Sequence, residues 1–195
     1  MTLPREWEEL NRDIRHCTRC PLCRTRTRSV AGDGSIHSRI MFVGEAPGAQ
    51  EDAHGHPFVG PAAALLEKLL AGVGIPRQEV FITNVLKCRP PDDRAPTDHE
   101  VERCIPYLRR QVALMRPPII CTLGNAAYRN LVDASADISR VRGQFFEKGR
   151  FSFFATYHPA AALHSQGDGI RDSLSRDFAT LAKKWRSGHG NHDQP

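Results

Sequence analysis

The stretch Ile40-Met41-Phe42-Val43-Gly44, which continues as Glu45-Ala46-Pro47-Gly48, decides the fold class of this chain. Four consecutive apolar residues that end at a glycine are typical of a strand buried on both faces of a sheet. Two further apolar runs follow the same pattern, since residues 80–83 end at Asn84 and residues 119–123 end at Gly124. The three runs predict strands whose carboxyl ends carry glycine or polar residues.

Helical patterns separate these strands. Residues 61–70 place leucines at helical spacing, and Thr97 with Glu100 forms a predicted capping box for a helix that continues to residue 112, with a kink expected at Pro106. Residues 144–156 are typical of a hairpin that turns near Lys148-Gly149. An apolar stripe predicts a final helix over residues 170–185.

This alternation predicts an α/β fold, namely a single-domain three-layer α/β/α sandwich with a central, mostly parallel sheet of about four strands. The length of 195 residues suits one such domain, expected over residues 1–186, with a disordered polar tail over 187–195. Ligands bind such sheets beyond the carboxyl ends of the strands. In this chain those ends carry Gly44-Glu45, Asn84, Gly124-Asn125 and His158.

The composition favours a basic, water-soluble protein. The formal net charge is +5, and the sequence pI is about 9.1, which favours polyanionic partners without singling one out. No apolar run is long enough to span a membrane, and the first residues lack the apolar stretch of a secretory signal. We therefore expect a cytoplasmic protein with no membrane partner.

The cysteines indicate a metal site or catalysis rather than disulfides, because a cytosolic chain seldom keeps disulfides. Cys17 and Cys20 form a CxxC, whose short loop lets two thiolates face one centre, and Cys88 and Cys104 lie far along the chain. Spacing alone favours zinc and an iron–sulfur cluster about equally, with cysteines of unrelated roles as a third possibility. Cys23 would form a second CxxC with Cys20, and spacing does not choose between these two.

Five motifs lie at or near the predicted strand ends: GEAPG at 44–48, ED at 51–52, GHPFVG at 55–60, TNVLKCRPP at 83–91 and YHPAA at 157–161. Taken singly, each residue in them has an ordinary structural explanation, such as a tight turn or a core plug. Together, and in this order, the motifs resemble those of the family 4 uracil-DNA glycosylases, the iron–sulfur members of their superfamily. The resemblance extends from the CxxC to the final helix.

The resemblance implies a structural [4Fe–4S] cluster. Its ligands carry over to Cys17, Cys20, Cys88 and Cys104, which leaves Cys23 and Cys121 free. Cys121 lies inside an apolar strand, where a cysteine usually serves as a small hydrophobe.

The resemblance also implies a pocket for a flipped uracil, lined by Gly44, Glu45, Ala46, Phe58, Asn84 and His158. Phe58 would stack on the base and Asn84 would bind its polar edge. His158 would stabilise the uracil anion as the glycosidic bond breaks. His158, Glu45 and Asn84 are the candidate catalytic residues, and Glu51 is the second candidate for the carboxylate role of Glu45.

The implied substrate is uracil-containing DNA, single- or double-stranded, and the implied product is free uracil. Leu163 and His164 resemble an intercalating loop, and residues 140–143 (Arg-Val-Arg-Gly) are a candidate phosphate contact. A solvated basic turn explains that second segment equally well. We expect a monomer that acts at the nucleoid.

Three other functions compete with this interpretation. Covalent-trapping relatives carry an inserted KRRIH-type loop, which is absent from residues 87–91. A non-catalytic DNA-binding module would have lost Asn84 or His158, and both are present. A zinc-stabilised hydrolase would lack the visible absorption of an iron–sulfur cluster.

Overall fold

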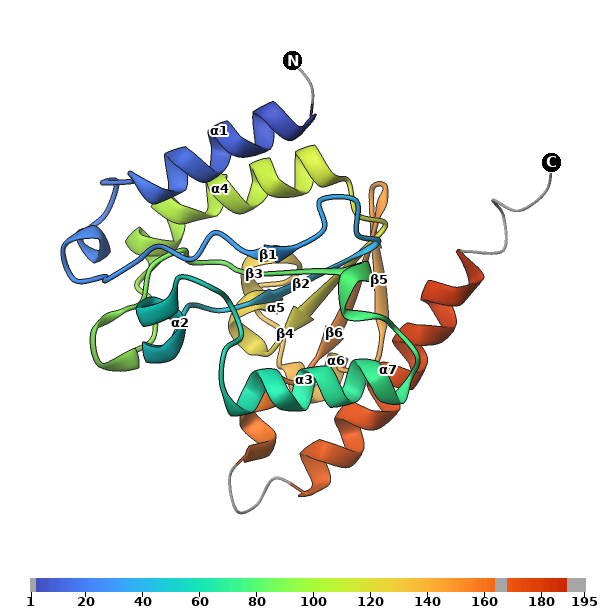
Figure 1. The fold of residues 1–195 in the computed structure, drawn as a ribbon. Helices are drawn as coiled ribbons and strands as arrows, with labels where there is room; N and C mark the ends of the chain where they lie inside the picture. The colour runs from blue at the N-terminus through green and yellow to red at the C-terminus, as the bar shows by residue number, and fades with distance from the viewer. Residues whose placement is uncertain (1–2, 164–167, 189–195) are drawn as a thin grey trace.

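Six strands form one sheet at the centre of the molecule, in the order β1-β3-β2-β4-β6-β5 (Figure 1). They are β1 (Asp33–Gly34), β2 (Ile40–Gly44), β3 (Val80–Asn84), β4 (Ile119–Leu123), β5 (Phe145–Lys148) and β6 (Phe151–Thr156). The four inner strands β3, β2, β4 and β6 run parallel, whereas the edge strands β1 and β5 are antiparallel to their neighbours. The computed structural model describes residues 3–163 and 168–188.

The mostly parallel sheet is confirmed, but it has six strands rather than about four. Strand β1 adds one edge and comprises only Asp33 and Gly34, which is too short to produce an alternating pattern in the sequence. Strand β5 adds the other edge as the outer strand of the predicted hairpin. The two extra strands therefore flank the sheet without changing its parallel centre.

Helices cover both faces of the sheet (Figure 1). The helices are α1 (Leu3–Arg15), α2 (Ala49–His54), α3 (Pro61–Gly72), α4 (Asp98–Met115), α5 (Asn125–Leu131), α6 (Ile138–Val141) and α7 (Asp168–Ser187), and short 3₁₀ turns include η1 (Pro21–Arg24) and η4 (Pro159–Leu163). Figure 1 shows α1 and α4 on one side of the sheet and α3 and α7 on the other. The three predicted layers are thus present.

The two-residue period of strand β2 divides the core between these faces. Ile40 and Phe42 pack with residues of α3 and α7, and Met41 and Val43 pack with residues of α4 and α5. All four side chains are fully buried. A strand buried on both faces reads as a continuous apolar run, which is how the sequence presents it.

The predicted capping box is confirmed at the start of α4. Thr97 Oγ1 accepts from the backbone N–H of Glu100 at 3.3 Å, and the Glu100 carboxylate accepts from the backbone N–H of Thr97 at 2.9 Å. Pro106 lies inside α4, which continues as one helix to Met115. Among the described residues, no helix is both long and apolar enough to cross a membrane.

Candidate active site

The carboxyl ends of the parallel strands meet at one edge of the sheet, and there the ends of β2 and β3 lie side by side. Gly44 is paired with Asn84 in the sheet register. A Cβ atom on Gly44 would lie 2.4 Å from Asn84 Oδ1 and 3.5 Å from the Phe58 ring. The Asn84 amide thus fits beside residue 44 only because that residue is a glycine, so Gly44 is part of the site through its missing side chain.

A pocket of about 230 Å³ opens at this edge, and its lining residues are Ala46, Gly48, Glu51, Phe58, Ala62, Asn84, His158 and Ala160. Its volume is below the range of roughly 300–1,000 Å³ that is usual for drug-sized ligands. Four of the six predicted pocket residues line it directly, and Gly44 adjoins it through Asn84 and Phe58. Glu45 is not among the lining residues.

Asn84 is held rigidly at the end of β3. The residue is only 2% exposed. Within the described part of the chain its side-chain amide has no hydrogen-bond partner, although it faces the pocket. A fixed, unpaired amide offers both a donor and an acceptor to a ligand.

Phe58 adopts a backbone conformation that aromatic residues rarely take. Its φ is +54°, in the left-handed region, which costs free energy and is found mainly where the surrounding structure imposes it. Its ring lies 5.4 Å from the His158 ring, centroid to centroid, at 33°. The loop that carries Phe58 thus directs an aromatic face into the pocket.

His158 follows β6 and faces the same pocket. Gly124, at the end of β4, lies against it, since a Cβ atom there would be 3.2 Å from His158 Cβ. Burial lowers the pKa of His158 to about 4, so the imidazole is neutral at neutral pH. The ring is therefore available as a neutral hydrogen-bond donor.

The two candidate carboxylates have different surroundings. Glu51 lines the pocket, and its carboxylate accepts from the backbone N–H groups of Gly48 and Val59, both at 3.1 Å. Glu45 is half-buried, and burial raises the pKa of its carboxyl group. The geometry favours Glu51 as the carboxylate nearest a pocket ligand, and Glu51 also holds the loop that bears Phe58.

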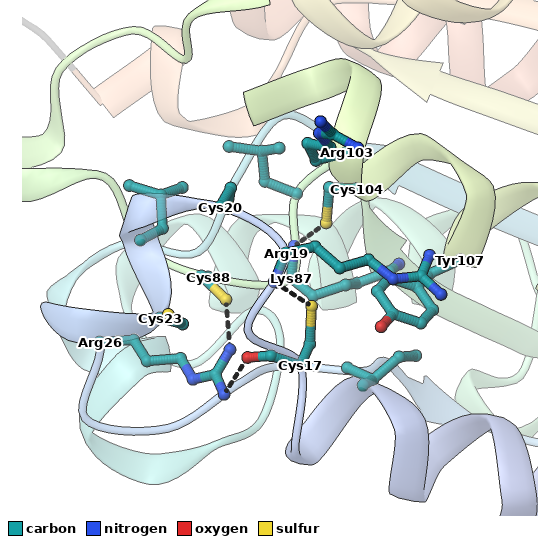
Figure 2. A pocket seen from close by; sticks show the side chains of 13 residues that line it. Cys17, Arg19, Cys20, Cys23, Arg26, Lys87, Cys88, Arg103, Cys104 and Tyr107 are labelled. Atoms are coloured by element: carbon teal, nitrogen blue, oxygen red, sulfur yellow. Dashed lines mark hydrogen bonds between the residues drawn. The ribbon is translucent and has the colours of Figure 1, made fainter. Parts of the chain in front are cut away.

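Five of the six cysteines line one cavity between η1, the end of α1, the β3–α4 connection and α4 (Figure 2). They are Cys17, Cys20, Cys23, Cys88 and Cys104. Cys121 lies in β4, fully buried in the core, as expected for a small hydrophobe. Among the described residues, no group of three or more His, Cys, Asp or Glu converges closely enough to hold a single metal ion.

Cys20 and Cys23 differ in their packing. Cys17 and Cys20 pack against the apolar cluster that contains Cys88 and Cys104, and Cys23 does not. Burial raises the pKa of Cys104 to about 12 and also raises the pKa of Cys88 and Cys20. Thiols in such surroundings stay protonated unless a metal takes the place of the proton.

Cationic and backbone donors surround the sulfur atoms (Figure 2). Arg26 Nη1 donates to Cys88 Sγ at 3.0 Å, and Arg26 Nη2 donates to the carbonyl oxygen of Cys17 at 3.0 Å. The backbone N–H of Lys87 donates to Cys104 Sγ at 3.2 Å. Arg19 and Arg103 also line the cavity. These positive charges would offset the negative charge of a thiolate-bound centre.

Sequence reasoning missed the long-range contacts of two residues in the quoted motifs, Asp52 and Lys87. Asp52, 5% exposed, accepts from the backbone N–H of Thr27 at 2.9 and 3.0 Å and so ties α2 to the segment after the N-terminal cysteines. The buried Lys87 lies between Asn84 and Cys88. Lys87 belongs to one of the quoted motifs, but its partners are distant in sequence and only the fold reveals them.

The expectation that Arg142 contacts phosphate is not supported. Its guanidinium forms a two-pronged ion pair with the buried Asp177 and donates to the carbonyl oxygen of Ser173 at 2.9 Å. Thr156 Oγ1 donates to the same carboxylate at 2.7 Å. Arg142 therefore joins the end of α6 to α7, whereas the neighbouring Arg140 is exposed.

Leu163 ends η4, five residues after His158, and is the exposed large hydrophobic residue of the described chain, at 40%. An apolar side chain in this position suits insertion into a base stack. His164, the other residue of the predicted intercalating loop, lies outside the described residues.

Comparisons with known proteins agree with this geometry. Residues 31–184 match the model of the uracil DNA glycosylase superfamily. A type-4 uracil-DNA glycosylase of Archaeoglobus fulgidus is 44% identical over 184 residues, which is 90% of this chain and 92% of the relative. The type-4 enzymes of Saccharolobus solfataricus and Sulfurisphaera tokodaii are 42% and 41% identical, over 85% and 89% of this chain and 80% and 82% of the relatives.

Proposed function

Because this chain belongs to the type-4 enzymes of the uracil-DNA glycosylase superfamily, we propose that it flips uracil out of DNA and hydrolyses the N-glycosidic bond. The reaction leaves an abasic site for base-excision repair and releases free uracil. The pocket formed by Phe58, Asn84 and His158 at the carboxyl end of the sheet is the observation that carries the proposal.

Recognition of the base rests on Phe58 and Asn84. The bond cannot be reached inside a duplex, so the base must leave the stack and enter the pocket. The Phe58 ring would stack on it, an interaction worth roughly 1–3 kcal/mol per base. The fixed Asn84 amide would bind the polar edge, on which uracil and cytosine present opposite donor and acceptor patterns.

Bond cleavage rests on His158. As the bond breaks, the sugar acquires the character of an oxocarbenium ion and the base leaves as the uracil anion. A neutral imidazole that donates a hydrogen bond stabilises the negative charge developing on the base. Water then adds to C1′ of the sugar, and its proton is lost to solvent or to a nearby base. The uracil anion takes up a proton from solvent, so the overall products are the abasic sugar and neutral uracil.

A carboxylate can stabilise the sugar cation or orient the attacking water. Glu45 and Glu51 both follow β2. The position of Glu51 in the pocket supports Glu51 in this role more directly than Glu45. The backbone N–H groups of Gly48 and Val59 bond to its carboxylate and would hold it in place at the pocket.

We further propose that Cys17, Cys20, Cys88 and Cys104 hold a [4Fe–4S] cluster. Five cysteines that line one cavity support a thiolate-bound centre, and the resemblance to the iron–sulfur glycosylases favours a cluster over a single zinc ion. The shared packing of these four, without Cys23, supports the choice of Cys20. Such a cluster would join the N-terminal segment to the β3–α4 connection. It would thereby stabilise the end of β3, where Asn84 lies.

The basic charge and the exposed Leu163 support a DNA substrate. Phosphate contacts would make binding weaken as salt rises. Leu163 would enter the space that the flipped base leaves. A chromosomal substrate would place the enzyme at the nucleoid, and a single chain contains the whole proposed site.

The test is incubation of the purified protein with a labelled oligonucleotide that contains one uracil, followed by alkali, which cleaves the strand at abasic sites. We expect cleavage at the uracil position only. A matched oligonucleotide with thymine at that position is the control. Intact uracil-containing DNA after incubation with folded, iron-loaded protein would rule the proposed function out.

A further inference from the structure

Lys87 is a buried charged residue that lies between the pocket and the cysteine cavity. It is 1% exposed, three residues after Asn84 and one residue before Cys88. Its ammonium turns back toward β3, where Nζ donates to the carbonyl oxygen of Asn84 at 2.7 Å. The two other partners of Nζ are Thr83 Oγ1 at 2.5 Å and Gln111 Oε1 at 2.8 Å.

The three oxygen atoms that contact Lys87 Nζ all act as hydrogen-bond acceptors. The Thr83 hydroxyl donates to the carbonyl oxygen of Ala31 at 2.8 Å, so its oxygen can accept from Lys87. Gln111 Nε2 donates to the same carbonyl oxygen at 2.7 Å, which leaves Gln111 Oε1 as the acceptor. An ammonium has three protons and no lone pair, and here each proton has a partner.

Burying a lysine in a core costs free energy even when it is fully hydrogen-bonded, and an apolar side chain of similar volume would often be as stable. The contact with Asn84 offers a functional reason for the lysine. It fixes the peptide that carries the base-reading amide, while the backbone N–H of the same lysine is bonded to Cys104 Sγ at 3.2 Å.

We infer that Lys87 is a positioning residue for uracil excision, which holds Asn84 in the orientation that reads the base and anchors it to the cysteine cavity. This inference rests on the proposed function. Lys87 does not line the pocket, so it would act through Asn84.

The decisive experiment is a double-mutant cycle with Lys87→Met and Asn84→Ala. Lys87→Met keeps the apolar stem and removes the ammonium. We expect it to lower the single-turnover rate at least about tenfold in the otherwise unchanged protein and less than about twofold in the Asn84→Ala background, because the two residues act as one unit. Affinity for free uracil, measured by calorimetry, should follow the same non-additive pattern.

Gln111→Leu is the matched control. It removes one acceptor from the same network but leaves the bond between Lys87 and Asn84, so it should lower the melting temperature with a much smaller loss of rate. Iron content should be the same in all variants. If Lys87→Met does not fold, Lys87→Gln, which keeps a donor on a side chain one atom shorter, enters the cycle in its place.

Equal rate losses from the Lys87 substitution in both backgrounds would show a purely structural lysine and overturn the inference. An unchanged rate in Lys87→Met would overturn it as well. Failure of the proposed function is a separate result, because then the protein without substitutions would not release uracil.

Discussion

The backbone N–H of Ala160 donates a hydrogen bond to Nδ1 of His158 over 3.1 Å. A backbone N–H can only donate, so Nδ1 must be the acceptor, and the single ring proton of the neutral imidazole lies on Nε2. A turn of η4 thus selects the tautomer, and His158 is left with one donor to direct at a ligand.

The pH dependence of excision follows from this neutral ring. The pKa of His158 is lowered to about 4 by burial, so the ring stays neutral while pH falls through the usual histidine value. We expect the single-turnover rate to show no histidine titration near pH 6.5 and to fall only as pH approaches 4. The unfolded chain does take up this proton below about pH 6.5, so stability should decline between 6.5 and 4. A rate that changes with an apparent pKa near 6.5, in a titration that disappears in His158→Ala, would contradict a neutral donor.

Gly44→Ala tests the contact between β2 and Asn84. The new methyl group would lie 2.4 Å from Asn84 Oδ1, so the amide must move. We expect a loss of single-turnover rate comparable with that of Asn84→Ala, on the order of a hundredfold, as for removal of a preorganised hydrogen-bonding group. Gly72→Ala is the control, because a Cβ atom there meets nothing within 4 Å, and it should leave the rate unchanged.

The two carboxylates can be separated by isosteric substitution. Glu51→Gln should slow single-turnover excision at least about tenfold, because Glu51 lines the pocket and supports the loop of Phe58. Glu45→Gln should have a smaller effect, since Glu45 is not among the lining residues. The reverse order of the two rates would return the carboxylate role to Glu45.

Arg142→Ala should destabilise the fold rather than weaken DNA binding alone. It leaves the buried carboxylate of Asp177 without its cation, which typically costs about 3–5 kcal/mol. Urea unfolding measures this loss. Arg140 is exposed, so Arg140→Ala should leave stability unchanged. It should reduce the slope of log DNA affinity against log salt concentration by about 1. Normal stability in Arg142→Ala would show that the ion pair contributes little.

The cysteine ligands can be tested by colour and iron content. The purified protein should be brown and contain about four irons per chain, as four cysteines bind one [4Fe–4S] cluster. Cys104→Ser should bleach the protein and destabilise it, while Cys23→Ser should do neither, because Cys23 is outside the shared apolar packing. A colourless protein with one zinc would rule out the iron–sulfur cluster. Bleaching by Cys23→Ser would assign Cys23, in place of Cys20, as a ligand.

Local patterns were sufficient to predict the layers of this fold. The apolar run of β2 identifies a doubly buried strand because both of its faces meet apolar neighbours, so no polar residue can interrupt it. The capping box of α4 is equally local, since Thr97 and Glu100 bond within one turn. The short edge strand β1 was not predicted, because two residues are too few to show a periodic pattern. This strand forms only through its pairing with β3.

The sequence by itself determined the family, through the motifs and their resemblance, and it determined the candidate site residues at the ends of the strands. Only the tertiary structure decided how those residues act. Arg142 reads as a free cation until α7 brings Asp177 to it from 35 positions away. Lys87 is only one letter of a motif in the sequence, and the fold encloses it among Thr83, Asn84 and Gln111. A side chain's role depends on which partners surround it, and long-range packing sets those partners, whereas a local pattern records only its neighbours in the chain.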